Sequence, residues 1–267
     1  KYELNFEAIP DLSLDKKYKP YFNYKGNVEV TDINGETQTN QTEVRVGYLA
    51  IDASVDVPSY IDTKQENKIS VNTNNLNGQP EPTDIKIEIY SLKQPKNPLK
   101  SKPWTTVDEQ LISKTEFEKL FPYDVYNNEN DTRHWEKGSL VKTYSFNTKD
   151  QKAILLKANE WNAGTYLVEF SCKDKNDNAI TFSNTFTAGT YADKLPQPPT
   201  FLNLQTDKNS LQPGDTLNYK ISSSLKNVYV VLEVKHQNKW IERKTILIEN
   251  NTAFFKLPIT EELRGGL

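Results

Sequence analysis

Apolar and polar residues alternate with a period of two along most of this chain, as in β-strands that bury one face. The apolar positions of the central runs are predicted to point into one core: Ile69, Val71, Ile85, Ile87, Ile89, Tyr166, Val168 and Phe170. Aromatic residues make up 11% of the chain, and Val, Ile and Thr are abundant, which suits pleated, half-buried surfaces. The pattern predicts antiparallel sheets packed face to face as β-sandwiches.

Turn signals join these runs into hairpins. Asp32-Ile-Asn-Gly-Glu separates two alternating runs near the start of the chain, and Asp174-Lys-Asn-Asp-Asn separates two more. Pro213-Gly214 precedes a further alternating run, because Pro presets φ and Gly accepts a positive φ. In an immunoglobulin-like sandwich, a hairpin of this kind supplies the last two strands.

Residues 93–138 interrupt the strand pattern and are predicted to be an insertion. Ser113 and Glu116 match a capping box and Pro122 stops a helix, so a short helix is expected near residues 114–121. The apolar side chains expected to fix this helix to the sandwich are Leu111, Phe117, Leu120 and Phe121.

These signals divide the chain into three β-units. Residues 1–52 offer too few strands for a sandwich and are interpreted as the C-terminal part of one, whereas residues 53–192 make a complete sandwich that carries the insertion. Leu195-Pro-Gln-Pro-Pro is a stiff linker, and residues 199–267 start a third sandwich. The predicted fold class is therefore all-β: tandem immunoglobulin-like antiparallel β-sandwiches with one short helical insertion.

Composition narrows the classes of function. The formal net charge of −3 argues against nucleic acid or an anionic membrane as a partner. No apolar run approaches the roughly 18 residues of a membrane span. Strand-like sequence starts at Lys1 without a signal peptide, so we expect a piece of a longer protein. Cys172, the only cysteine, alternates with apolar neighbours and is interpreted as a small buried hydrophobe.

One loop gathers aromatic and acidic residues and is the candidate interaction loop: Tyr123, Tyr126, Asp131, His134 and Trp135. Carboxylates around aromatic rings occur in sugar-binding sites and glycosidases. A solvated loop with its aromatic rings packed inward explains the same residues more simply, because no second constellation supports catalysis. The sequence carries no nucleophile elbow, phosphate loop, dinucleotide fingerprint or zinc-protease motif. We expect no catalytic residue, no cofactor and no metal.

Two other features have simple structural interpretations. His236 alternates with Val234 on a predicted strand and is interpreted as a packing or surface residue rather than a base. The turns at Asp32 and Asp174 faintly resemble calcium loops, but the first has its Gly at the fourth position rather than the sixth and the second has none. Both are interpreted as hairpin turns.

Several segments, in consecutive order, resemble the α-2-macroglobulins of bacteria, particularly the large surface lipoproteins of Bacteroidetes. Val28–Thr37 and Val44–Tyr48 are similar to the end of one macroglobulin-like domain. The segments similar to the next domain are Thr73–Pro82, Phe121–Asp131 and Trp135–Gly138. Thr206–Gly266 is similar to the bait-region domain. The order of these segments across three units carries the resemblance.

The resemblance implies a protease trap, in which a target protease cleaves an exposed bait segment and the full-length protein rearranges around it. The implied partners are target proteases, through the full-length protein, and other domains of the same chain. Many members carry a thioester in a Cys-Gly-Glu-Gln motif, whereas Cys172 stands in Ser-Cys-Lys-Asp, so no thioester role transfers. The implied role is scaffold at the periplasm or cell surface, lipid-anchored through a segment outside this chain.

The main alternative is a cell-surface adhesion or carbohydrate-binding module built from immunoglobulin-like repeats. Exposed Tyr and Trp rings in the loop at residues 121–136 would favour that alternative. A glycoside hydrolase with Asp131 among its carboxylates ranks third.

Overall fold

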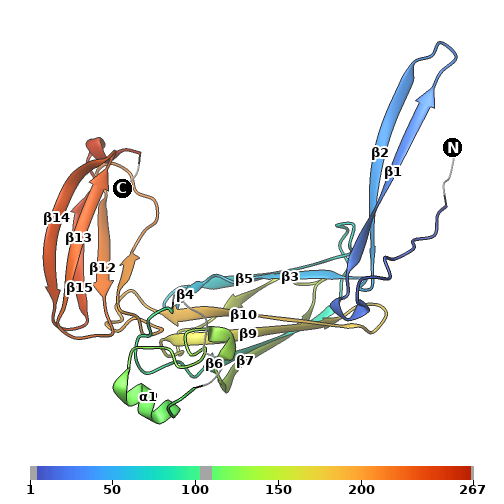
Figure 1. The fold of residues 1–267 in the computed structure, drawn as a ribbon. Helices are drawn as coiled ribbons and strands as arrows, with labels where there is room; N and C mark the ends of the chain where they lie inside the picture. Colours follow the sequence, from blue (N-terminus) through green and yellow to red (C-terminus); the bar gives the residue numbers. More distant parts are fainter. Residues whose placement is uncertain (1–4, 103–109, 266–267) are drawn as a thin grey trace.

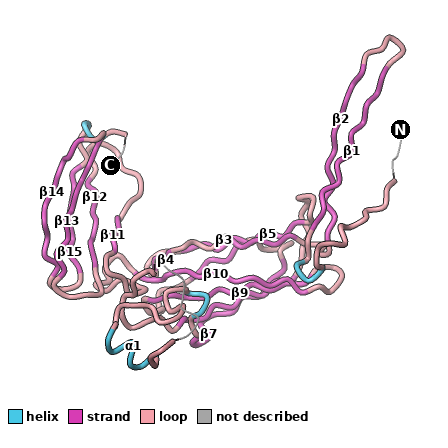
Figure 2. Tube along the Cα trace, viewed as in Figure 1, coloured by secondary structure: helices cyan, strands magenta, loops and turns pink. Residues whose placement is uncertain are grey.

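A computed structural model describes residues 5–102 and 110–265 of the chain. Figure 1 shows three β-units in a row: an extended ribbon, an elongated central sandwich, and a smaller C-terminal unit that rises from the opposite end of the sandwich. Strands and loops make up most of the trace, and the α-helix lies beside the central unit (Figure 2). The units follow one another in the order of the sequence, so a single segment of the chain connects each unit to the next.

The first unit is a two-stranded antiparallel ribbon preceded by a 3-10 turn, η1 (Lys16–Tyr18). Its strands, β1 (Tyr21–Thr31) and β2 (Thr37–Gly47), pair along their whole length. The register gives the ribbon one mainly apolar face, which contains Phe22, Tyr24, Val28, Val30, Val44 and Val46. Val28 and Val30 are 51% and 63% exposed. The assignment of residues 1–52 to part of a larger sandwich stays a prediction.

The central unit packs a five-stranded sheet, in the order β4-β10-β9-β6-β7, against a three-stranded sheet, in the order β3-β5-β8. Its strands are β3 (Asp52–Asp56), β4 (Tyr60–Asp62), β5 (Asn67–Asn74), β6 (Asp84–Leu92), β7 (Lys137–Asn147), β8 (Ala153–Leu156), β9 (Gly164–Lys173) and β10 (Ala179–Gly189). The pairs are antiparallel except for the short parallel contact of β4 with β10. The predicted tandem immunoglobulin-like fold class is confirmed.

The core of the central unit contains every residue that the alternation placed there. Ile69, Val71, Ile87 and Ile89 are fully buried, and the other predicted positions are at most 5% exposed. Tyr166 stacks on Phe186 with ring centroids 5.5 Å apart. Cys172 belongs to the same core, which confirms its interpretation as a buried hydrophobe.

The insertion forms helix α1 (Lys114–Leu120) and a 3-10 turn, η2 (Thr132–His134). The Ser113 hydroxyl accepts from the Glu116 amide at 3.3 Å, as the capping box predicts. The expected anchoring of the helix to the sandwich is wrong: Leu111 is 91% exposed and Leu120 is 58% exposed. Phe117 instead contacts Tyr126 within the insertion, because this two-turn helix packs on its own loop.

The C-terminal unit contains a three-stranded sheet, β11-β12-β15, and a two-stranded sheet, β13-β14. Its elements are β11 (Asn203–Thr206), β12 (Thr216–Ser222), β13 (Val228–His236), β14 (Lys239–Ile248), β15 (Thr252–Pro258) and η3 (Glu261–Leu263). A small core between the sheets includes Tyr219, Ile221, Leu232 and Ile248. Gly214 has a φ of +97°, as the predicted Pro-Gly turn requires. The boundaries predicted at residues 53–192 and 199–267 stay predictions.

Three hairpin turns share one hydrogen-bond pattern. A side-chain oxygen of the first residue accepts from the backbone amides two and four residues later. Asp32, Asn75 and Asp174 are those first residues. The fourth residue of each turn has a positive φ, which Gly35 adopts without strain. The two aspartate turns are therefore held by their own amides, as the hairpin interpretation requires.

Candidate functional site

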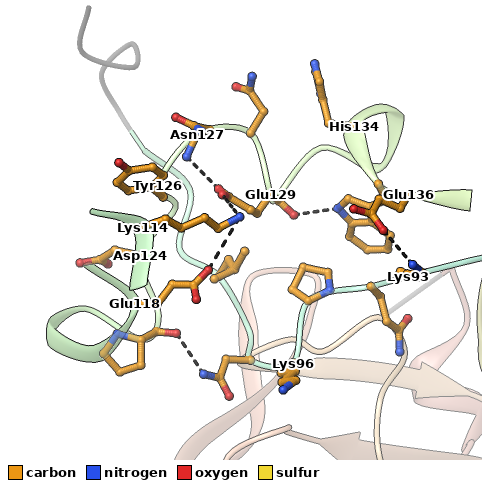
Figure 3. A pocket seen from close by; sticks show the side chains of 17 residues that line it. Lys93, Lys96, Lys114, Glu118, Asp124, Tyr126, Asn127, Glu129, His134 and Glu136 are labelled. Carbon is orange, nitrogen blue, oxygen red and sulfur yellow. Dashed lines mark hydrogen bonds and ion pairs between the residues drawn. The ribbon is translucent and has the colours of Figure 1, made fainter. Parts of the chain in front are cut away.

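The insertion lines an open-sided cavity of about 670 Å³, which is the candidate site. Its walls come from the segment after β6, from α1, from the loop after the helix and from the residues just before β7 (Figure 3). These segments are far apart in sequence, and the loop ends meet because β6 and β7 are neighbours in the five-stranded sheet. The sandwich therefore positions the cavity at one end of an adjacent strand pair.

Three of the five predicted site residues line this cavity: Tyr126, His134 and Trp135. The Trp135 indole donates to the Glu129 carbonyl at 2.7 Å, and the Tyr126 hydroxyl donates to the Ile112 carbonyl at 2.9 Å. Two of the polar groups that a ligand would use are thus occupied inside the protein. The His134 side chain is 53% exposed. Figure 3 shows it turned away from the ion pairs of Lys114 with Glu129 and of Lys93 with Glu136.

Asp131 and Tyr123 do not line the cavity. The Asp131 carboxylate forms an ion pair with Arg133 at 2.7 Å and lies 3.3 Å from the His134 imidazole. Hydrogen bonds from Arg133 hold the pKa of Asp131 well below its usual range. The Tyr123 ring packs against Phe201, at a centroid distance of 5.9 Å, and so contacts the start of the third unit.

The sequence interpretation missed the charged pairs that line the cavity. Lys114 lies 2.9 Å from Glu129 and 3.8 Å from Glu118, and Lys93 lies 2.8 Å from Glu136 (Figure 3). Only the helical spacing of Lys114 and Glu118 could have been found in the sequence, as an i, i+4 pair. The other pairs join positions 15 and more residues apart, which only the fold brings together.

Most of the charged side chains that line the cavity form ion pairs. Burial opposes ionisation of Glu129, but hydrogen bonds from Lys114 and the Asn127 amide outweigh it and lower its pKa. A hydrogen bond from Lys93 lowers the pKa of Glu136. A glycosidase needs one carboxylic acid with a raised pKa to protonate the leaving group. These two carboxylates are shifted in the opposite direction, so they do not supply that acid.

The remaining groups of chemical interest lie in cores. Burial raises the pKa of the Cys172 thiol to about 11, with the Asp174 charge adding to the shift. A thiol with a raised pKa is a poor nucleophile at neutral pH. His236 is 8% exposed on β13, which agrees with a packing role. Over residues 5–102 and 110–265, no group of three or more His, Cys, Asp or Glu could hold a metal ion.

Fold and site together describe a chain of immunoglobulin-like β-sandwich units with a cavity on an insertion, lined mainly by ion-paired side chains. No family model matches the sequence, and no curated protein matches it. Within the ranges that the structure covers, no helix has the length and apolar character needed to cross a membrane.

Similar solved structures include bacterial α-2-macroglobulins and a repeat of a large adhesion protein. Native Escherichia coli α-2-macroglobulin is 11% identical, with a TM-score of 0.29, over 90% of this chain and 15% of that chain. The trypsin-activated form of that protein is 11% identical, with a TM-score of 0.32, over 90% of this chain and 17% of that chain. The tetra-tandem repeat from the extending region of a large adhesion protein is 15% identical, with a TM-score of 0.28, over 91% of this chain and 50% of that chain. This chain thus spans half or less of these structures, and such low scores carry no argument about activity.

Proposed function

We propose that this chain is a structural scaffold segment of an α-2-macroglobulin-like protease trap. The support is the order of the resembling segments across three consecutive β-units. These segments are Val28–Thr37 and Val44–Tyr48, then Thr73–Pro82, Phe121–Asp131 and Trp135–Gly138, and then Thr206–Gly266. In this proposal the thioester and the bait segment belong to other parts of the full-length protein, and this chain has no enzymatic activity of its own. The full-length protein acts at the periplasm or cell surface, held there by a lipid anchor.

The single observation that carries the scaffold role is the internal pairing of the groups in the insertion. Lys114 is paired with Glu129, Lys93 with Glu136, and the Trp135 indole with a carbonyl. Groups that satisfy one another in the free protein stabilise a shape, whereas a preorganised site presents its polar groups to a ligand. The lone cysteine is a free thiol buried in the central core, and a thiol without a thioester carbonyl has no acyl group to transfer to a protease.

The test compares this chain with the full-length protein in the presence of trypsin. We expect the full-length protein to be cleaved at one exposed segment outside residues 1–267, to become more compact in solution scattering, and to retain the protease. The isolated chain should neither inhibit the protease nor form a covalent adduct with it. Stoichiometric inhibition by the isolated chain would place the bait within it and overturn the scaffold role.

A second candidate, a carbohydrate-binding adhesion module, is favoured by one observation: Tyr126, His134 and Trp135 line the same cavity. Aromatic rings are common sugar platforms. A glycan array tests this candidate with the Trp135→Ala variant and, as a matched control, the Trp240→Ala variant on the C-terminal unit, where Trp240 is 55% exposed. Saturable binding lost only in Trp135→Ala would favour adhesion over the scaffold role.

A further inference from the structure

Lys220 is a buried lysine at the junction of the central and C-terminal units. It lies on β12 and is 3% exposed, although lysine is rarely buried without partners. Its ammonium donates to the Asp193 carbonyl at 2.9 Å and to the Thr190 carbonyl at 3.3 Å. It also lies 5.3 Å from the centre of the Tyr191 ring. All three partners belong to the turn that follows β10, so a lysine of one unit is bound by the end of the other.

The turn that receives Lys220 is itself fixed. The Asp193 carboxylate accepts from the Thr190 amide at 2.6 Å and from the Thr190 hydroxyl at 2.9 Å. The Asp193 amide donates to the Thr190 carbonyl at 3.1 Å, which closes the turn. A Cβ atom at Gly189 would lie 2.9 Å from the same carboxylate, so glycine leaves room for this closure. The two carbonyls are therefore held in place for the ammonium.

Contacts on both sides of the turn extend the junction. The Tyr191 ring lies 5.8 Å from the Phe254 ring of β15, and the Thr252 hydroxyl bonds the Lys194 carbonyl. Tyr60 of β4 and Gln205 of β11 line one cavity between the two units. These contacts make an interface of both units rather than a bare linker.

The insertion supports the same junction from another direction. Tyr123 packs on Phe201, and the Gln94 side chain hydrogen-bonds Gln197 in the proline-rich linker. The insertion thus contacts the linker, and β12 and β15 contact the turn that precedes it. This bracing gives Tyr123 a structural role outside the cavity.

We propose that Lys220 selects one orientation of the C-terminal unit on the central sandwich. A buried ammonium without its partners is strongly disfavoured, whereas ring contacts such as that of Tyr191 with Phe254 persist when the rings slide over one another. Orientations that keep the interface closed but move the Thr190 and Asp193 carbonyls away from Lys220 are therefore disfavoured. The lysine contributes orientation rather than net stability, and the two units move as one rigid body. The inference does not depend on the protease-trap proposal.

The test measures the distance between spin labels on the two units, at Lys142→Cys in β7 and Lys239→Cys in β14, in a Cys172→Ala background. We expect one narrow distance distribution. Lys220→Met, which keeps the length and removes the charge, should at least double its width while circular dichroism stays native. The exposed Lys226→Met variant is the matched control and should leave the width unchanged.

Asp193→Ala changes the junction on the side of the central unit. It therefore tests the inference even where Lys220→Met disturbs β12. It should broaden the distribution as much as Lys220→Met, and the double variant should be no broader than either single variant. Distributions as narrow as that of the parent in both single variants would overturn the inference. Additive broadening in the double variant would also overturn it, because the two residues would then act independently.

Discussion

Replacing Asp174 by Asn should break one specific connection between the N-terminal ribbon and the central sandwich. One carboxylate oxygen accepts from the Asn176 and Asn178 amides, both at 2.9 Å, and forms the turn. The other accepts from the Ala50 amide at 2.9 Å and from the Asn178 side chain at 3.0 Å. Asn can keep the first set, as Asn75 does in its own turn, but its NH₂ group would face two donors.

The magnitude follows from the bonds that are lost. Losing hydrogen bonds to a charged acceptor and leaving a partly buried donor unpaired costs about 1–3 kcal/mol. Several hydrogen bonds outweigh the opposing effect of burial and lower the pKa of Asp174 from 3.8 to about 2. At about 1.4 kcal/mol per pKa unit this gives roughly 2–3 kcal/mol before solvent screening is discounted. We therefore expect a loss of about 2 kcal/mol from the central unit at pH 7.

The assay is calorimetric unfolding of the parent and Asp174→Asn chains between pH 7 and pH 2. Because the folded pKa is depressed, the stability from the carboxylate is present above pH 3.8 and is lost as the pH falls toward 2. The difference between the two chains should therefore shrink over that range. Asp177→Asn, in the same turn with its side chain 89% exposed, is the matched control and should unfold like the parent. Equal stability of parent and Asp174→Asn at pH 7 would refute the reasoning.

Three further predictions concern the helix, the thiol and the core. Ser113→Ala should destabilise α1 by about 1 kcal/mol through loss of its cap, seen as faster amide hydrogen exchange over the helix; unchanged exchange would contradict it. Cys172, with its pKa raised to about 11, should react with a disulfide reagent at pH 8 only on unfolding, so rapid native labelling would count against its burial. Ile87→Ala should cost about 2–5 kcal/mol in denaturant unfolding. Leu155→Ala, at a 57% exposed position, is the control, and similar losses in both would refute the core assignment.

The sequence by itself determined the strands, the faces that they bury, and the local turns. Alternation is a property of neighbouring residues, so Ile85, Ile87 and Ile89 could be assigned to one face without knowledge of their partners. The Ser113 cap is equally local, since donor and acceptor are three residues apart. The prediction for Leu111 and Leu120 was wrong, because an apolar side chain alone does not indicate which surface a short exposed helix packs against.

Only the tertiary structure decided the connections between units. Alternation with Tyr219 and Ile221 places Lys220 on the outward face of its strand, and the sequence does not reveal that the turn after β10 covers that face. Asp174 was predicted as a turn residue, but its bond to the Ala50 amide joins positions 124 residues apart. The ion pair of Lys93 with Glu136 likewise spans 43 residues. A strand pattern records which face of a strand is apolar, whereas the element that covers its other face is set by how whole units pack.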